Sequence, residues 1–195
     1  TGVQTCALPI LKTIAQVLLV FLVLHVSAQD KYANTYACTK GKIHFFSSTM
    51  MEDIEATSNS AVCVLNTQTQ KVNSIIKHTS FLFKDKLMQE HFNENYMESD
   101  KYPQGMLDMT IQENIDFTKD GTYDVTLKGT LDMHGVKFER EIKGKLTIAN
   151  GQPTHATATF IVKLSDHKIK VPSIVGANIA DDLKVDIDYT FEKYK

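Results

Sequence analysis

Hydrophobic and polar residues alternate in two consecutive runs of opposite phase between residues 121 and 148. The hydrophobic residues take the odd positions from 123 to 133 and then the even positions from 136 to 148. A period of two is typical of a β-strand with one buried face. His134 and Gly135 lie between the runs as a two-residue turn, in which glycine readily adopts a positive φ. The pattern predicts a long antiparallel hairpin with these pairs: Met133 with Val136, Leu131 with Phe138, Leu127 with Ile142 and Tyr123 with Leu146.

The same alternation recurs before and after this hairpin and predicts further strands. Residues 42–47 and 54–65 form the first two, with a polar interruption at 57–60. The remaining strands are expected at residues 71–83, 107–117, 156–164 and 183–191, and a long connection is expected at 166–182.

Between the third and fourth of these strands the period changes. Leu87, Met88, His91, Phe92 and Tyr96 follow one another at i, i+1, i+4, i+5 and i+9. This spacing places them on one face of a helix. Pro103 ends the segment, because proline cannot continue a helix. We therefore expect one helix in a chain that is otherwise made of strands.

Eight strands and one helix predict a mainly β fold, a closed eight-stranded antiparallel barrel. Closure removes the unpaired sheet edges that invite aggregation. A barrel of this size is either filled by its own side chains or holds one small ligand. The inward positions include the small residues Gly129, Gly144, Ala156 and Ala158. Together with several Met and Phe they favour an elongated apolar cavity, and a packed core is the alternative.

The N-terminal part of the chain has the composition of a targeting segment. Lys12 precedes a mostly hydrophobic run, residues 13–26, that ends in the small residues Ser27 and Ala28. This pattern predicts a signal peptide over residues 11–28, cleaved near Ala28, and hence a periplasmic or secreted protein. A retained anchor helix is the alternative.

The first ten residues, TGVQTCALPI, do not fit that segment. A signal peptide opens with Met and one or two basic residues, and residues 1–10 contain neither. They resemble the translation of a sequencing adaptor joined to a truncated reading frame. We expect an artefact here, give Cys6 no role, and take residues 29–195 as the mature domain.

Two cysteines remain in the expected mature domain. If Met50 and Met51 lie at the tip of a hairpin, Cys38 and Cys63 face each other across antiparallel strands. An oxidising compartment favours a disulfide, whereas cross-strand geometry strains one. A Cys38–Cys63 disulfide and two buried free thiols are equally compatible with the sequence.

Charge and histidine spacing argue against two kinds of partner. The chain has 21 Lys and Arg against 23 Asp and Glu, a formal net charge of −2, without the basic stripe that nucleic-acid binding needs. The histidines of the mature domain form neither an i, i+4 pair nor a His-x-Glu grouping of the metal-binding type. We expect no metal site, and we expect His134 to be solvated in its turn.

Motifs for catalysis are missing from the sequence. It contains no Gly-x-Ser-x-Gly, no Cys-His signature and no glycine-rich phosphate loop. Ser165, Asp166 and His167 are adjacent, and at a strand end neighbouring side chains point in opposite directions. We therefore expect that these three side chains do not act together.

Three segments resemble a known family. Residues 90–103 (EHFNENYMESDKYP), 128–136 (KGTLDMHGV) and 160–172 (FIVKLSDHKIKVP) occur in the order and spacing of the YceI-like family of exported lipid-binding proteins. The first segment is the most specific. The resemblance covers essentially the whole expected mature domain.

The resemblance implies a lipocalin-like barrel with an internal tunnel for a long apolar molecule. Family members hold a polyisoprenoid, an isoprenoid quinone or a fatty amide, and the family is not known for catalysis. We accordingly expect no cofactor other than a bound lipid. Further expectations are transient contact with a membrane and a monomer or homodimer.

Aromatic and thioether side chains, with one isoleucine, are the candidates for the cavity wall. Flexible Met and flat rings suit a long apolar ligand better than a rigid core does. Each of these residues could also belong to a packed core. The candidates are Phe45, Phe81, Phe83, Phe92, Tyr96, Met97, Met109, Phe160 and Ile174.

Arg140 departs from the family pattern, which usually has a small or apolar residue at this position. In the predicted hairpin it lies opposite Gly129 and points inward, and a three-residue loop at 119–121 would place Glu113 opposite Leu127. Glu113 and Arg140 would then flank Gly129 inside the barrel, where a charge must be paired or reach water. Our hypothesis is a Glu113–Arg140 pair that grips a ligand head group. A purely structural pair, or a bulge that turns one of them outward, is the alternative.

The sequence therefore predicts an exported protein, not an enzyme, that sequesters or carries a long-chain apolar ligand. The alternative is a filled barrel that acts as an interaction module in an envelope stress response without a ligand. A hydrolase-like enzyme on the same scaffold is a third and weaker hypothesis.

Overall fold

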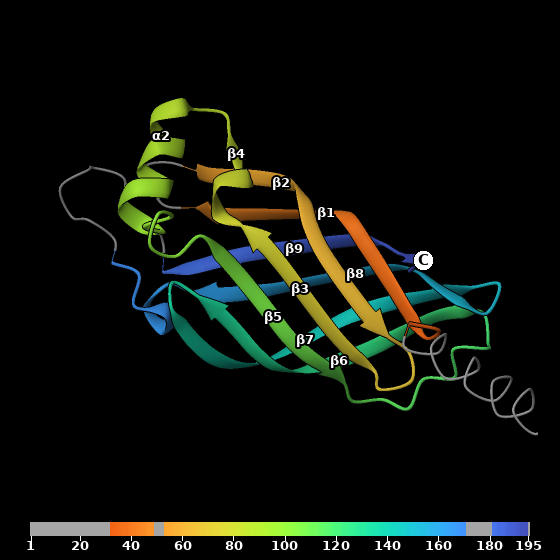
Figure 1. Cartoon of the computed structure of the whole chain (residues 1–195). Coiled ribbons are helices and arrows are strands. Elements are labelled where there is room, and N and C mark those ends of the chain that lie inside the picture. The colour runs from red at the N-terminus through yellow and green to blue at the C-terminus, as the bar shows by residue number, and fades with distance from the viewer. Residues whose placement is uncertain (1–31, 49–52, 171–180, 195) are drawn as a thin grey trace, which may run out of the picture. The chain divides into compact units, whose positions relative to one another are not determined.

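Eight strands of the computed structural model close into one antiparallel barrel (Figure 1). The structure describes residues 32–48, 53–170 and 181–194. By its internal contacts the chain divides into two units, residues 1–34 with 195 and Thr35–Tyr194. Of the first unit the structure describes only a turn at 32–34. The second unit is the barrel.

The barrel sheet runs from β1 through β9, β8, β7, β6, β5, β3 and β2 and returns to β1. Its strands pair antiparallel throughout, which confirms the predicted fold class. Two further strands, β4 and β10, are two residues long; β4 pairs with β2, and β10 pairs with β1. The bounds are β1 Thr35–Ser48, β2 Asp53–Asn66, β3 Lys71–Lys77, β4 Leu82–Phe83, β5 Gln104–Ile111, β6 Gly121–Met133, β7 Val136–Ala149, β8 Gln152–Lys163, β9 Asp182–Thr190 and β10 Glu192–Lys193.

The β6–β7 hairpin has the predicted register along its whole length. Met133 pairs with Val136, Leu131 with Phe138, and the ladder continues to Gly121 opposite Ile148. His134 and Gly135 have φ angles of 53° and 73°. Positive φ at both central residues is the conformation of the two-residue turn that matches strand twist, and glycine adopts it without steric cost.

The predicted β5–β6 register is wrong by two residues. Met109 rather than Ile111 lies opposite Gly129, because the chain leaves the sheet after Ile111. The Gln70 side chain holds it there: its amide donates to the carbonyls of Ile111 and Glu113 at 3.2 and 2.8 Å. The side-chain carbonyl of Gln70 accepts a hydrogen bond from the Ile115 backbone N–H at 3.0 Å. Residues 112–120 therefore form a loop and not a strand end.

Cys38 and Cys63 pair directly across β1 and β2, as predicted. Both are buried, and both are free thiols in this structure. Burial raises the pKa of the Cys63 thiol far above its usual value, with a smaller contribution from Cys38. The neutral thiol is therefore the favoured state in the barrel wall.

The third predicted strand ends earlier than expected. A 3₁₀ turn, η1 (His78–Ser80), separates β3 from β4. The His78 backbone N–H donates to the Pro103 carbonyl at 3.0 Å, and the His78 side chain is buried. This hydrogen bond between residues distant in sequence turns the chain away from the β-sheet after Lys77.

One short α-helix lies at one end of the barrel (Figure 1). Helix α2 (Lys86–His91) is capped by Asp85, whose side chain accepts a hydrogen bond from the Met88 N–H at 2.9 Å. It continues into a π turn, η2 (Phe92–Tyr96). The predicted helix is confirmed, and Pro103 lies well beyond its end. A further 3₁₀ turn, η3 (Ser165–His167), follows β8.

Strands β7 and β8 are paired over only part of their length. The ladder runs from Ala149 opposite Gln152 to Gly144 opposite Ala158. Beyond that point β7 still pairs with β6, and β8 still pairs with β9. The first half of β7 and the second half of β8 are therefore not paired with each other, and this leaves a split in the barrel wall.

Candidate functional site

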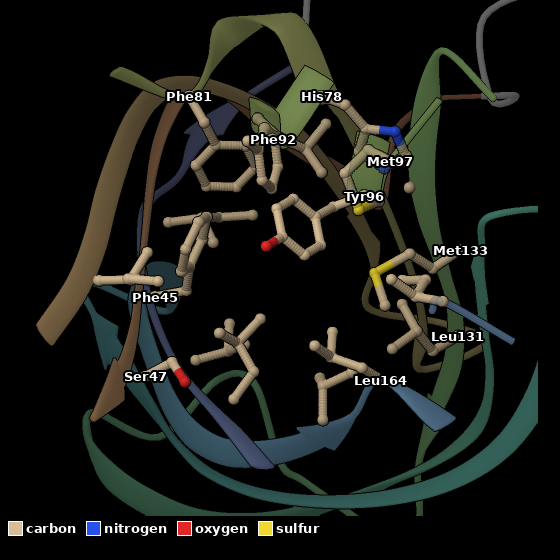
Figure 2. A pocket seen from close by; sticks show the side chains of 18 of the residues that line it. Phe45, Ser47, His78, Phe81, Phe92, Tyr96, Met97, Leu131, Met133 and Leu164 are labelled. Carbon is tan, nitrogen blue, oxygen red and sulfur yellow. The ribbon is translucent and has the colours of Figure 1, made fainter. Parts of the chain in front are cut away.

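An apolar cavity of about 120 Å³ lies inside the end of the barrel that α2 covers. Figure 2 shows its wall, with side chains pointing inward from the strands and from the helical segment. Ile43 and Phe45 come from β1, Leu131 and Met133 from β6, and Phe92 from η2. The cavity is thus enclosed by strands far apart in sequence and capped by the helical segment.

Four phenylalanines form one connected cluster in this wall. Phe92 lies 5.5 Å from Phe45, 5.8 Å from Phe81 and 5.0 Å from Phe83 between ring centroids. Phe45 also contacts Phe81 and Phe83 at 5.1 and 5.7 Å. Offset and edge contacts at these distances are favourable for aromatic rings. The cluster ties β1, β4 and η1 to the helical segment.

Seven of the nine predicted wall residues line this cavity. They are Phe45, Phe81, Phe83, Phe92, Tyr96, Met97 and Phe160. Met109 instead lines a second cavity deeper in the barrel. Ile174 lies outside the described residues.

Several wall residues were not predicted. Met88 could have been found from its i, i+4 relation to Phe92, and Met133 from its inward phase in the hairpin. Ser47 and His78 are polar residues that line an apolar cavity. The hydrophobic pattern carries no signal for such positions.

The second cavity has a volume of about 70 Å³ and is lined by residues of β2, β3 and β5 to β9, with Phe191. Ser74, Leu107 and Ile187 line both cavities, so the two spaces meet at this layer. Here the hydroxyls of Ser74 and Tyr189 are hydrogen-bonded at 2.7 Å in the buried interior. Burial raises the pKa of Tyr189 well above its usual value, so its hydroxyl stays protonated. The interior therefore holds two voids in line, and the Ser74–Tyr189 pair lies in the wall of the deeper one, at the layer where the two meet.

Arg140 does not pair with Glu113. The Glu113 carboxylate accepts from the Thr126 backbone N–H at 2.8 Å, and this bond lowers the pKa of Glu113. Arg140 lies in the split between β7 and β8, where it donates to the Ile161 carbonyl at 2.7 Å and lies 3.8 Å from the Asp166 carboxylate. Neither Arg140 nor Glu113 is among the described residues that line the two cavities. The hypothesis of an internal Glu113–Arg140 pair is wrong, because the incorrect β5–β6 register placed Glu113 inside the barrel and because Arg140 bonds within the β7–β8 split.

Two predictions about histidines need correction. His134 occupies the β6–β7 turn, but its side chain is only 10% exposed, with Nε2 bonded to Glu98 at 2.8 Å and Nδ1 donating to the His167 carbonyl. Ser165–His167 form a 3₁₀ turn and not a strand end. Their side chains still have separate partners: the Ser165 hydroxyl bonds to Asp181, Asp166 faces Arg140, and the His167 imidazole bonds to the β6–β7 turn.

The described part of the chain has neither a metal-binding cluster nor a helix that could span a membrane. No group of three or more His, Cys, Asp or Glu within residues 32–48, 53–170 and 181–194 has the arrangement of a metal site. Within the same residues, no helix has the length and hydrophobicity needed to cross a membrane.

The polar atoms of the main cavity wall are few and buried. Tyr96 and His78 are 7% and 2% exposed, and Ser47 is 1% exposed. Burial raises the pKa of Tyr96 and lowers the pKa of His78, so both groups are neutral near pH 7. Figure 2 shows the Tyr96 hydroxyl pointing into the cavity.

A closed barrel around an apolar cavity is the architecture of proteins that enclose a small apolar molecule. A family model described as the YceI-like domain matches residues 25–191. The chain belongs to the YceI-like family.

Solved structures share this fold. A polyisoprenoid-binding domain from Saccharophagus degradans, implicated in plant cell wall breakdown, has 14% identity and a TM-score of 0.65 over 83% of this chain and 99% of that one. BcnA from Burkholderia cenocepacia has 18% identity and a TM-score of 0.59 over 78% and 96%. A YceI protein from Campylobacter jejuni has 20% identity and a TM-score of 0.53 over 69% and 81%. At these identities the likeness establishes the fold alone. No curated protein matches the chain.

Proposed function

We propose that this protein is an exported carrier that sequesters one long apolar molecule of the polyisoprenoid, isoprenoid-quinone or fatty-amide class. The observation that carries the proposal is the apolar cavity at the α2 end, in line with a second void deeper in the barrel. Transfer of an apolar chain from water into such a space is favourable by about 0.8 kcal/mol per buried CH₂. The polyisoprenoid-binding domain of S. degradans with the same fold supports this ligand class.

The size of the cavity sets a condition on this function. About 120 Å³ is less than the roughly 300–1,000 Å³ of ordinary ligand sites. A long chain therefore fits only if wall side chains move aside. Met88, Met97 and Met133 are suited to this movement, because an unbranched thioether side chain changes rotamer easily.

The two voids also argue against the alternative function, a filled barrel that acts as an interaction module without a ligand. A barrel that serves only as an interaction module has no need of an unfilled interior, and packed interiors leave few voids larger than a water molecule. Two voids in line weigh against the filled-barrel alternative. Nothing in the arrangement of Ser165, Asp166 and His167 favours catalysis, since each is bonded elsewhere.

The test is native mass spectrometry of the purified protein, followed by organic extraction. We expect a bound mass that extracts as a polyisoprenoid, quinone or fatty amide. A ligand-free mass, together with no binding of added quinones, isoprenoid alcohols or fatty amides, would overturn the carrier function. The protein would then be tested for a protein partner, as the filled-barrel alternative requires.

Export and membrane contact are part of the same proposal. Residues 11–28 are proposed as the signal peptide, and N-terminal sequencing of the exported protein would be expected to give a start near Gln29. Near α2, Leu82 and Leu87 are 65% and 58% exposed, and Lys84 and Lys86 lie between them in the sequence. We propose that this stretch touches anionic membranes during ligand transfer. Flotation with anionic vesicles should retain the wild-type protein and lose a Leu82→Ser/Leu87→Ser variant.

A further inference from the structure

His78 combines a fixed orientation with an unpartnered nitrogen in the cavity wall. Its backbone N–H donates to the Pro103 carbonyl, and its Nδ1 lies 2.6 Å from the Tyr102 carbonyl. The side chain is almost completely buried, yet Nε2 has no hydrogen-bond partner. Buried polar atoms are nearly always paired, so an unpaired one in the wall of a ligand cavity requires an explanation.

The hydrogen bonds of His78 determine what Nε2 can do. A carbonyl oxygen only accepts, so Nδ1 carries the proton in the bond to Tyr102. Burial disfavours the imidazolium and lowers the pKa of His78. In the neutral ring Nε2 is then a hydrogen-bond acceptor. It needs a donor, and it makes no hydrogen bond to any described residue of the wall.

Gly105 leaves room for one methyl-sized group beside this nitrogen. A Cβ at Gly105 would lie 3.4 Å from Nε2 and 3.5 Å from the Ile76 side chain, both ordinary contact distances. The backbone of Gly105 does not have the positive φ that calls for glycine. Alanine would therefore fit here sterically, and its methyl group would occupy the space next to Nε2.

We propose that His78 Nε2 accepts a hydrogen bond from the head group of the ligand, so that the cavity selects an apolar chain ending in an uncharged donor, a hydroxyl or a primary amide. This inference rests on the proposed carrier function and narrows its ligand class. The head group lies beside Gly105, and the chain runs into the apolar remainder of the cavity.

The wall disfavours a charged head group. None of the described residues that line this cavity is a lysine or an arginine. A carboxylate or diphosphate only accepts hydrogen bonds, and it would face another acceptor in Nε2. Burying such a charge without a partner is strongly unfavourable.

Ser47 is the competing partner for a head group in this cavity. Its hydroxyl is also buried, unpartnered and in the wall of the same cavity. Figure 2 shows Ser47 and His78 on opposite sides of the cavity. One head group bonded to His78 is therefore not expected to depend on Ser47.

The experiment compares three probes with the same fifteen-carbon chain: farnesol, farnesene and farnesyl diphosphate. Each displaces a fluorescent apolar reporter, 1-aminoanthracene, from the full chain and from four variants. His78→Asn keeps an amide N–H for the Tyr102 carbonyl but removes Nε2, and Gly105→Ala fills the space beside it. Ser47→Ala removes the competing hydroxyl, and Val62→Leu, at an exposed position that lines neither cavity, is the control. One neutral hydrogen bond corresponds to about a two- to twelvefold difference in affinity.

We expect farnesol to bind the wild-type protein about two- to twelvefold more tightly than farnesene, and farnesyl diphosphate to bind most weakly. His78→Asn and Gly105→Ala should abolish the preference for farnesol, whereas Ser47→Ala and Val62→Leu should keep it. Equal affinities of farnesol and farnesene in the wild type, or a preference that survives both cavity variants, would overturn the inference while leaving the carrier function intact. If no probe binds, the carrier function itself fails. Should His78→Asn not fold, Gly105→Ala alone decides.

Discussion

Tyr189 and Ser74 form a buried hydroxyl pair where the two voids meet, and each is 4% exposed. Loss of one hydroxyl leaves the other without a partner in the interior, and that costs about 1–3 kcal/mol. We expect Tyr189→Phe and Ser74→Ala each to lower the free energy of unfolding by this amount. The double variant should lose less than the sum, because it leaves no unpaired hydroxyl. Urea denaturation of the four proteins measures the cycle, and additive losses would contradict the prediction.

His78 and His167 make the stability of the barrel depend on pH. Burial is the main cause that lowers the pKa of both imidazoles below the ordinary value of 6.5. As pH falls through 6.5 the unfolded chain takes up protons that the folded barrel does not, so the free energy of unfolding falls. The slope is at most about 1.4 kcal/mol per pH unit for each histidine, and the loss ends below the lowered pKa values.

Urea denaturation at pH 7.5, 6.5 and 5.5 tests this dependence. We expect the wild-type protein to lose stability over this range and a His78→Asn/His167→Asn variant to lose distinctly less, whatever its stability at pH 7.5. Equal pH slopes in the two proteins would show that other groups titrate. For His167, the groups that face the ring are Arg140 and Asp166, and for His78 the neighbouring titratable group is His134.

At the scale of elements, helix α2 is held at its start by one side chain. Asp85 accepts the Met88 N–H, and removal of such a cap costs about 0.5–2 kcal/mol. We expect Asp85→Ala to speed hydrogen exchange of the amides of residues 86–96 about two- to thirtyfold, with little change in the barrel strands. Glu94→Ala, at an exposed position of η2, is the control. Faster exchange throughout the strands would mean that the cap stabilises the whole domain and not the helical segment.

The two hairpins around β6 show where the sequence pattern is sufficient and where it is not. The β6–β7 register follows from local alternation and a two-residue turn, and the structure confirms it. The β5–β6 register depends on Gln70, which fixes the loop from more than forty residues away. A side-chain bond of that kind leaves no mark on hydrophobic periodicity. Glu113 was misplaced as a direct consequence. Arg140 lies opposite Gly129 as predicted, but its side chain bonds to the Ile161 carbonyl in the split between β7 and β8, which local alternation does not reveal.

Some residues of the candidate site could likewise be predicted from the sequence pattern, and others could not. Hydrophobic wall residues such as Phe45 and Phe92 could be predicted, because inward phase and ring chemistry are both visible in the sequence. His78 could not, since it lies where a predicted strand breaks into a 3₁₀ turn against the distant Pro103. Its importance comes from a buried, unpartnered nitrogen, a property of the folded barrel alone.

At the scale of the whole molecule, the two voids in line should make the affinity of the barrel depend on the length of the ligand's apolar chain. A short ligand fills the cavity under α2, and a longer one must pass the layer of Ser74, Leu107 and Ile187. Burial of even two of the five carbons in an added isoprene unit, at about 0.8 kcal/mol each, exceeds the 1.4 kcal/mol of a tenfold change. We therefore expect geranylgeraniol to bind at least tenfold more tightly than farnesol.

Ala156 offers a way to block only the deeper void. It lines that void and not the main cavity, so Ala156→Leu places three added carbons there. Farnesol should bind this variant within about twofold of the wild type, while the advantage of geranylgeraniol falls below about twofold. Val62→Leu, on the exposed outer face of β2, should keep the wild-type length dependence. If Ala156→Leu weakens both alcohols equally, or neither, the ligand chain does not reach the deeper void, and the cavity under α2 must hold its whole length.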